Sequence, residues 1–356
     1  MSDPGEAPGG TGEHRAPPGG TGEHEDRLWM GEAVELGRSV RTSTSPNPWV
    51  GAVIVPPGGD PVALGATSPP GGPHAEAVAL ELAGSTARGS TVYVTLEPCS
   101  HHGRTPPCAD ALIAAGVSRV VVGVADPDPR VAGQGLARLR AAGVEVAVGV
   151  GADEVGRSLA PYLKHRRTGR PWVVLKLAAT LDGRTAAPDG SSRWITGPLA
   201  RADVHRLRAE SDAIAVGSGT VRADDPALTV RDAEGRHPRR IVLGTIPEGA
   251  RVRPADSHRG PPEALLDRLG AEGVVQLLVE GGPTVAGQWH RLRLVDQYVI
   301  YLAPALLGGD DGRPVLAGPG APTMADVWRG AITSVRQVGP DVRIDVLADS
   351  DGHGLP

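Results

Sequence analysis

Two kinds of hydrophobic pattern alternate along this chain. Short continuous runs of apolar residues predict strands, and stretches whose apolar residues recur every three or four positions predict helices. From Asp26 onward the two patterns follow one another across glycine-containing turns, which indicates an α/β domain with a largely parallel sheet. The predicted strands are Val50–Val55, Thr91–Leu96, Arg119–Val124 and Val144–Val148, and the predicted helices are Arg27–Leu36, His74–Ala83, Ala109–Ala115 and Gly135–Ala142.

The same alternation resumes after a helical connector, residues 149–170. The pattern therefore divides the chain into a tail at 1–25, an α/β domain at 26–148, the linker at 149–170 and a second α/β domain at 171–350. In the second domain the predicted strands are Trp172–Leu177, Ala213–Val216, Arg240–Leu243, Val274–Val279, Tyr298–Leu302 and Val342–Val346, and the predicted helices are Leu199–Glu210, Glu263–Leu269 and Thr284–Leu292.

The first 25 residues carry the sequence PGGTGEH twice, at Pro8–His14 and Pro18–His24. A segment so rich in Gly, Pro, Thr and Glu buries too little apolar surface to offset the entropy lost on ordering. We therefore expect residues 1–25 to be a disordered tail.

Composition and charge narrow the functional class. The 356 residues carry a net charge of -5 and only 3% aromatic residues, which argues against nucleic acid as a partner. No apolar run approaches the ~20 residues that cross a bilayer, and the N-terminus lacks the pattern of a signal peptide. We therefore expect a cytoplasmic protein with no membrane partner. Two cysteines are too few for a disulfide framework, which leaves both thiols available as metal ligands.

The two cysteines and one histidine have the pattern of a catalytic zinc site. His74-Ala75-Glu76 begins a predicted helix, Cys99 follows a predicted strand, and Cys108 begins another helix. Zinc accepts one imidazole and two thiolates and keeps a fourth position open for water, whose pKa it lowers. A carboxylate two residues from the histidine can take a proton from that water and deliver it to a leaving amine. The sequence thus predicts His74, Cys99 and Cys108 as zinc ligands and Glu76 as the catalytic residue.

Two plainer interpretations compete with this one. A His-Ala-Glu tripeptide is common by chance, and cysteines are often simple core residues. A structural zinc site normally has four protein ligands, and the chain has no third cysteine to complete one. The two cysteines flank a single loop that follows the His-Ala-Glu motif, and this coincidence favours catalytic zinc.

The residues around this motif resemble a known family. Asn47-Pro48, Val50-Gly51, Pro73–Glu76 and the run TLEPCSHHGRTPPC at Thr95–Cys108 closely resemble the pyrimidine deaminase of riboflavin biosynthesis, in which eight residues separate the two cysteines. The resemblance implies a cytidine-deaminase-like, three-layer domain. It also implies zinc-dependent hydrolytic deamination of 2,5-diamino-6-(5-phosphoribosylamino)pyrimidin-4(3H)-one. The residues that it places against this small-molecule substrate are Asn47, His101 and Arg104.

Three positions depart from the pattern of the family. Thr67 and Val78 stand where many members carry His, and Asp128 stands where an Asn is usual. Since a carboxylate near a phosphate would repel it, one alternative is a paralogue with the same two folds that acts on a different pyrimidine, with only one site active. An alternative of another class, a nucleic-acid-editing deaminase, needs a basic groove and aromatic stacking faces, which this composition does not favour.

Glycine-rich segments follow the predicted strands of the second half. Leu278–Thr284 runs from a strand through Gly281-Gly282 into a helix, which lets a phosphate approach bare backbone and a helix N-terminus. With Val174–Arg184, Ser192–Thr196 and Val216–Pro226, it resembles the NADPH-dependent reductase that is fused to the deaminase in many bacteria. The resemblance implies a dihydrofolate-reductase-like α/β domain that reduces the ribosyl group of the deaminated product to ribityl.

The resemblance also implies the residues of this second site. Those expected to contact NADPH are Ala178, Trp194, Thr220, Asp224, Gly282, Pro283 and Thr284. Those expected to contact the substrate are Lys176, Asp182, Ser192, Arg208, Leu228, Arg231 and Glu280. Plainer roles stay open, with Trp194 as a core residue, Arg208 on a solvated helix face and Asp224 in a turn. Related reductases carry an apolar strand near 247–262 that is missing or very short here. The resemblance also implies a homo-oligomer, which is usual in the family.

Overall fold

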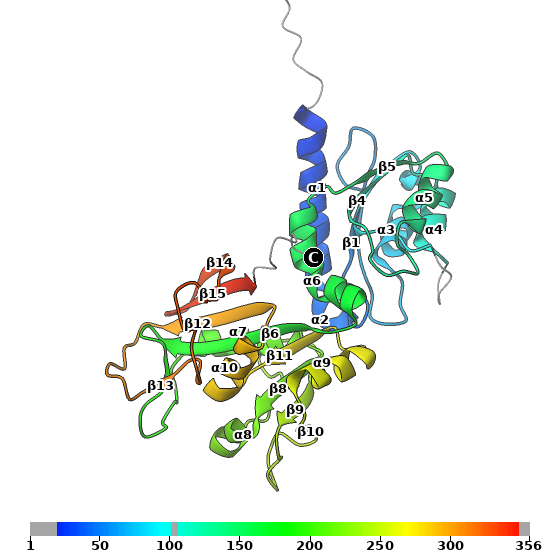
Figure 1. The fold of residues 1–356 in the computed structure, drawn as a ribbon. Helices are drawn as coiled ribbons and strands as arrows, with labels where there is room; N and C mark the ends of the chain where they lie inside the picture. Colours follow the sequence, from blue (N-terminus) through cyan, green and yellow to red (C-terminus); the bar gives the residue numbers. More distant parts are fainter. Residues whose placement is uncertain (1–19, 101–105, 349–356) are drawn as a thin grey trace, which may run out of the picture.

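The computed structural model describes residues 20–100 and 106–348, which form two α/β domains (Figure 1). The first domain is built on a five-stranded sheet with the order β2 (Ala63–Ala66), β1 (Gly51–Val55), β3 (Thr91–Leu96), β4 (Arg119–Val124) and β5 (Glu145–Val148). β3, β4 and β5 are parallel, whereas β1 runs antiparallel to both of its neighbours. The prediction of a largely parallel sheet was therefore wrong for β1 and β2, because the Pro56–Gly59 turn folds them into a hairpin.

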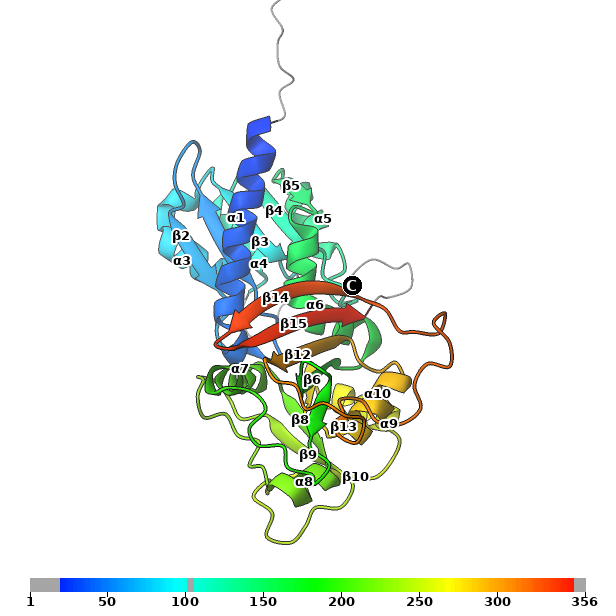
Figure 2. The same ribbon diagram turned by 90° about the vertical axis from the view of Figure 1, so that its left-hand side faces the viewer.

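Helices cover both faces of this sheet and complete the three layers of the predicted deaminase-like domain (Figures 1 and 2). One face is covered by α1 (Gly20–Ser39) and α6 (Ala152–Thr168), which also contact each other. The other is covered by α3 (Ala75–Ala83), α4 (Cys108–Ala115) and α5 (Gln134–Ala141). Ile54, Leu112, Leu139 and Leu163 are fully buried between these layers, which ties the helices to the sheet through apolar packing.

Helix α1 corrects part of the predicted tail. It begins at Gly20, so residues 20–25 are helical rather than disordered, while residues 1–19 lie outside the described part of the chain. Glu23 lies in the first turn, where a negative charge is favourable, and Glu25 accepts a hydrogen bond from the Trp29 indole at 3.4 Å. Asp26 is buried and accepts two hydrogen bonds from Arg119 of β4. The sheet thus anchors α1, although the composition of residues 20–25 disfavours a helix.

The second domain is built on an eight-stranded sheet whose order is β10-β9-β8-β11-β6-β12-β15-β14. These strands are β6 (Trp172–Thr180), β8 (Ala213–Gly217), β9 (Arg239–Leu243), β10 (Asp256–His258), β11 (Gln276–Val279), β12 (Gln297–Ala303), β14 (Gly330–Val338) and β15 (Asp341–Ala348). The strands from β10 to β12 are parallel, and β15 and β14 add an antiparallel pair at one edge. The strand expected to be missing or very short in 247–262 is β10, with three residues.

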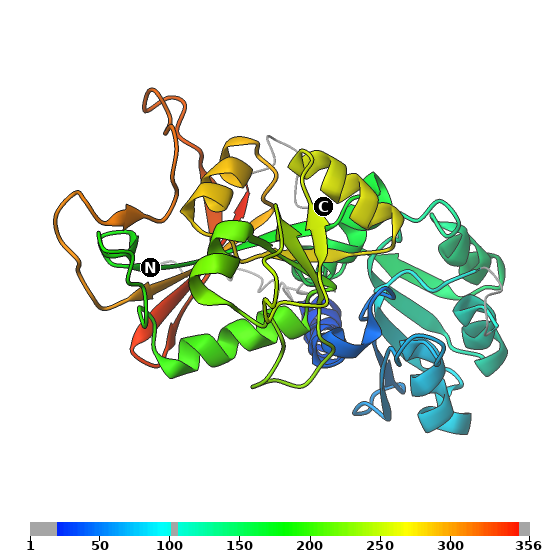
Figure 3. The ribbon, with the colours of Figure 1, turned by 90° about the horizontal axis from the view of Figure 1, so that it is seen from below.

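This sheet is also covered on both faces, as the view from below makes clear (Figure 3). Helix α7 (Pro198–Ala209) packs on one face through Val204 and Leu207, against Ile214 and Val299 of the strands. Helices α9 (Pro262–Ala271) and α10 (Pro283–Arg291) pack on the other. Helix α8 (Ser218–Asp224) follows β8, and β7 (Arg184–Ala186) pairs with β13 (Arg313–Pro314) in a small separate sheet. The arrangement is the predicted dihydrofolate-reductase-like domain.

Polar contacts join the two domains. Lys164, near the end of α6, pairs with Asp296 of the second domain at 2.5 Å. Arg41, in the short helix α2 (Arg41–Thr44), donates to the Gln276 side chain at 2.6 Å. The linker at 149–170 therefore contains a helix that packs on the first sheet and bonds to the second domain. Among residues 20–100 and 106–348, no helix combines the length and apolar character needed to span a bilayer.

Candidate functional site

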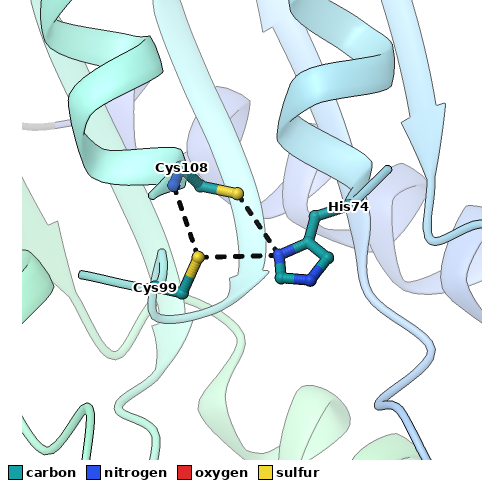
Figure 4. A group of neighbouring side chains, drawn as sticks. All are labelled: His74, Cys99 and Cys108. Atoms are coloured by element: carbon teal, nitrogen blue, oxygen red, sulfur yellow. Dashed lines mark hydrogen bonds between the residues drawn. The ribbon is translucent and has the colours of Figure 1, made fainter. Parts of the chain in front are cut away.

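Three side chains from separate segments of the first domain converge at the amino ends of α3 and α4 (Figure 4). His74 is the residue before the first turn of α3, and Cys108 is the first residue of α4. Cys99 lies three residues beyond the end of β3. The Nδ1 atom of His74 lies 3.6 Å from the Sγ atom of Cys99 and 3.4 Å from that of Cys108. Residues 25 and 34 positions apart in sequence thus form one cluster.

The distances in this cluster fit a zinc ion. Zn–N and Zn–S bonds of ordinary length at a tetrahedral angle place the nitrogen and sulfur about 3.5 Å apart, and the two observed separations, 3.6 and 3.4 Å, lie on either side of this value. The backbone N–H of Cys108 donates to the sulfur of Cys99 at 3.3 Å. Hydrogen bonding between the two sulfurs lowers the pKa of Cys99 and raises that of Cys108, because the pair shares a proton. A metal ion that replaces this proton would take both residues as thiolates.

Glu76 lies in the first turn of α3, two residues beyond His74, with only 4% of its surface exposed. It lines the same cavity as His74 and Cys99, a small chamber of about 150 Å³. Burial raises the pKa of Glu76 to about 7, so its carboxyl group can both accept and release a proton near neutral pH. The site therefore combines three atoms that could hold a metal ion with one buried carboxyl group.

Sequence reasoning missed the role of Glu97, two residues before Cys99. Its buried carboxylate accepts hydrogen bonds from the backbone N–H groups of Asp126, Gly133, Gly135 and Leu136. These contacts fix the segment that closes the cavity on the side of α5. The sequence did contain a signal for this role, a glutamate between an apolar strand and a Pro-Cys pair. A charged group at the end of a buried strand needs hydrogen-bond partners.

The wall of the cavity contains one of the three predicted substrate contacts, Asn47. It also contains Thr67 and Asp128, two of the positions that depart from the family pattern. Val78, on α3, is not among the lining residues. His101 and Arg104 lie in residues 101–105, outside the described part of the chain.

The second domain contains a much larger cleft, of about 1000 Å³, at the carboxyl ends of β6, β8, β9 and β11. Ligands of open α/β sheets bind at this edge. All seven residues predicted to contact NADPH line the cleft: Ala178, Trp194, Thr220, Asp224, Gly282, Pro283 and Thr284. Six of the seven predicted substrate contacts line it as well: Lys176, Ser192, Arg208, Leu228, Arg231 and Glu280.

Asp182 differs from the rest of this set because it does not line the cleft. Its carboxylate accepts hydrogen bonds from the hydroxyl of Thr180 and from the backbone N–H groups of Leu307 and Gly308. Hydrogen bonding from Thr180 first, and from these N–H groups, lowers the pKa of Asp182 to about 2. The residue thus joins the turn after β6 to the loop after β12.

Three charged residues form the floor of the cleft. The guanidinium of Arg208 on α7 donates to both carboxylate oxygens of Glu280, at 2.6 and 2.8 Å. Burial alone would raise the pKa of Glu280, but the charge and hydrogen bonds of Arg208 outweigh burial and lower it. Lys176 on β6 is half-buried, and desolvation lowers its pKa. Arg208 therefore faces the cleft and is not the solvated helix residue that the plainer interpretation offered.

Two further features suit a phosphate-bearing cofactor. A Cβ atom at Gly281 would lie 2.6 Å from Val285, and one at Gly282 would lie 3.3 Å from the hydroxyl of Thr220, so glycine keeps this approach to α10 open. Trp194 is 70% exposed, with the guanidinium of Arg201 4.3 Å from its ring centroid. The indole of Trp194 therefore lies exposed in the wall of the cleft, and Trp194 is not a core residue. His205, which sequence reasoning missed, also lines the cleft beside Arg231.

Comparison with known proteins assigns each half of the chain. The model of the RibD C-terminal domain matches residues 171–344, and that of the cytidine and deoxycytidylate deaminase zinc-binding region matches residues 23–124. The riboflavin biosynthesis protein RibD of Escherichia coli is 44% identical, over 91% of this chain and 99% of the relative. RibD of Mycobacterium tuberculosis is 46% identical, over 90% of this chain and 96% of the relative.

Solved structures agree with the sequence comparisons. RibD of Acinetobacter baumannii superposes with a TM-score of 0.85 at 37% identity, covering 92% of this chain and 100% of that one. A diaminohydroxyphosphoribosylaminopyrimidine deaminase/5-amino-6-(5-phosphoribosylamino)uracil reductase of Thermotoga maritima superposes with a TM-score of 0.82 at 33% identity, covering 92% and 99%. With a zinc-binding deaminase domain and an NADPH-using reductase domain in one chain, this protein belongs to the RibD family of bifunctional deaminase/reductases of riboflavin biosynthesis.

Proposed function

We propose that His74, Cys99 and Cys108 hold the catalytic zinc and that Glu76 carries the protons of the deamination. The convergence of the three ligand atoms beside a buried glutamate supports this assignment most directly. When bound, zinc with one open coordination position lowers the pKa of a water molecule there. The carboxylate of Glu76 accepts a proton as water adds to the ring carbon that bears the amino group, and returns a proton to the nitrogen that leaves as ammonia.

We propose that the substrate of this site is 2,5-diamino-6-(5-phosphoribosylamino)pyrimidin-4(3H)-one, with Asn47, His101 and Arg104 as contacts. Asp128 stands where the family usually has Asn, and this departure was the reason to consider a different substrate. Its carboxylate is already paired, because Arg130 donates hydrogen bonds to it at 2.6 and 3.0 Å. A paired carboxylate repels a phosphate less than a free one, so Asp128 gives little support to a different pyrimidine.

In the second domain, we propose that Ala178, Trp194 and Thr220 contact NADPH, together with Asp224 and the segment 282–284. NADPH supplies a hydride to C1 of the ribosyl group, and the residues of the cleft orient the two molecules. The substrate would be held by Lys176, Ser192, Arg208, Leu228, Arg231 and Glu280. We assign Asp182 instead to the turn after β6, because its carboxylate is occupied by hydroxyl and backbone donors.

One coupled assay tests both halves. The purified protein is incubated with the phosphoribosylaminopyrimidine, zinc and NADPH, and ammonia release and NADPH oxidation are followed together. We expect both, with deamination first. Bound zinc without ammonia release would overturn the proposed deaminase substrate and favour the paralogue.

We further propose that the protein is a cytoplasmic homo-oligomer. Two free thiols at a metal site suit a reducing compartment. Light scattering during gel filtration tests the oligomeric state, and a mass equal to that of one 36.6 kDa chain would overturn it.

A further inference from the structure

The wall of the deaminase cavity that faces α6 is rich in carboxylates. Glu97, Asp126 and Asp128 line it together with Glu76. Among the described residues, three of the four have fixed polar partners. Glu97 accepts hydrogen bonds from backbone N–H groups. Asp126 accepts one from the hydroxyl of Tyr162 at 3.0 Å, and Asp128 accepts one from the guanidinium of Arg130. A phosphorylated substrate in this cavity therefore needs a cation to offset the negative wall.

The wall supplies two arginines, Arg130 and Arg166, and Arg130 is already paired with Asp128. Arg166 lies in the last turn of α6, lines the cavity, and leaves a quarter of its side chain exposed. Its guanidinium lies 5.0 Å from the centroid of the Tyr162 ring. Its Nε atom is 3.9 Å from Asp128, which is too far for a hydrogen bond.

Within the described part of the chain, the hydrogen-bonding capacity of Arg166 is unused. Its Nε atom is buried without a hydrogen-bond partner, and no hydrogen bond among residues 20–100 and 106–348 involves its guanidinium. Arg130 differs, because it donates three side-chain hydrogen bonds to Asp128. An arginine with a buried, unpartnered donor beside a cavity indicates a ligand with acceptor oxygens, since leaving such a donor unsatisfied costs free energy.

We propose that Arg166 binds the phosphate of the deaminase substrate and so makes this site selective for phosphorylated pyrimidines. The inference rests on the proposed function of the cavity and deepens it by naming the group that Arg166 recognises. The planar guanidinium matches two phosphate oxygens, and stacking on Tyr162 holds its plane. Asp128 assists by holding Arg130 at the same wall.

The test compares two substrates on the zinc-loaded full-length protein: the phosphorylated pyrimidine and the same compound without its phosphate. In the wild type we expect ammonia release with a clear preference for the phosphorylated compound. Arg166→Gln should lower kcat/KM for that compound by about 10- to 100-fold, mainly through KM, because a charge-assisted hydrogen-bond pair is lost. Turnover of the compound without phosphate should stay unchanged.

Arg167→Gln is the matched control, since Arg167 follows on the same helix and is exposed. It should leave both substrates unaffected. Equal loss on both substrates in Arg166→Gln, or no loss on either, would overturn the inference and leave the proposed function standing. A wild type that deaminates neither compound would overturn the proposed function, and the inference with it.

A second variant covers the case in which Arg166→Gln does not fold. Arg166→Lys keeps the charge but loses the planar pair of donors. Ribose 5-phosphate should inhibit wild-type deamination more strongly than ribose does, and Arg166→Lys should weaken inhibition by ribose 5-phosphate at least about fivefold. Equal inhibition of the wild type by the two sugars would overturn the assignment of Arg166 to phosphate.

Discussion

Arg208 and Glu280, which lie 72 positions apart in the sequence, form a two-point ion pair in the floor of the reductase cleft. Both side chains are about nine-tenths buried, with 12% and 10% of their surfaces exposed. Helix α7 supplies the arginine, and the glutamate is the residue that follows β11. The pair therefore ties one covering helix to the central sheet and places a guanidinium in the lining of the cleft.

Removing one partner of this pair should be costly. Arg208→Ala leaves the Glu280 carboxylate buried without its cation, which is expected to lower the free energy of unfolding by about 3–5 kcal/mol. Urea denaturation followed by circular dichroism measures this loss. The double variant Arg208→Met/Glu280→Leu should recover most of it, yet still oxidise NADPH poorly. Single and double variants of equal stability would contradict the buried-pair account.

Glu76→Gln should stop ammonia release while zinc stays bound. The glutamine amide occupies the space of the carboxylate but neither accepts nor releases a proton at neutral pH, so we expect a loss of about 10²- to 10⁴-fold in kcat. The reductase half of the same variant should still consume NADPH when given deaminated substrate. Elemental analysis for zinc is the control, because loss of the metal would attribute the defect to folding of the site.

Withdrawal of the metal should separate the two activities. Dialysis against a chelator is expected to abolish ammonia release and to leave NADPH oxidation on deaminated substrate within about twofold. Cys108→Ser should behave in the same way, because it removes one of three ligand atoms that lie within 4.8 Å of one another. Ammonia release that persists in metal-free protein would contradict the zinc site.

Asp203 should make the second domain sensitive to acid. Burial opposes ionisation of its carboxyl group, but hydrogen bonds from Tyr301, Arg336 and Arg343 outweigh burial and lower the pKa to about 2. Because the folded pKa lies below the unfolded value of 3.8, the stabilisation is present above pH 4 and is lost as the pH falls toward 2. The loss from this group is about 2 kcal/mol.

Comparison with Asp203→Asn isolates this contribution. The wild type should exceed the variant in free energy of unfolding at pH 5, and the difference should shrink between pH 4 and pH 2. Chemical denaturation at a series of pH values gives both curves. A difference that stays constant over this range would show that Asp203 does not titrate as described.

Much of the fold follows from local pattern. β3 begins and ends where the apolar run Thr91–Leu96 predicted, and β4 does so at Arg119–Val124. Buried parallel strands are continuous apolar runs bounded by glycine turns, so their limits are visible in the sequence. β2 and β14 were missed for the opposite reason. Ala63–Ala66 is short and weakly apolar, and Gly330–Val338 is an edge strand with exposed positions such as Ile332 and Val335.

The helix at the N-terminal end of the first domain marks another limit of local reasoning. Residues 20–25 have the composition of a disordered tail, yet they extend α1 because Asp26 is held by Arg119 in the sheet. A contact across 93 positions thus overrides local propensity. The same holds for Asp182, whose motif suggested a substrate contact but whose carboxylate meets backbone donors from residues 307 and 308.

The sequence by itself determined the chemistry of this protein. Residue type and spacing set the candidate donor atoms of the metal site and the proposed proton carrier, and the glycine-rich strand ends set the proposed cofactor segment, because those functions depend on which groups are present. Only the tertiary structure decided how charges are paired. Whether Asp128 repels a ligand, and whether Arg166 is left free to bind one, depends on side chains brought together from α6 and the loop after β4, and electrostatic interaction follows distance in space.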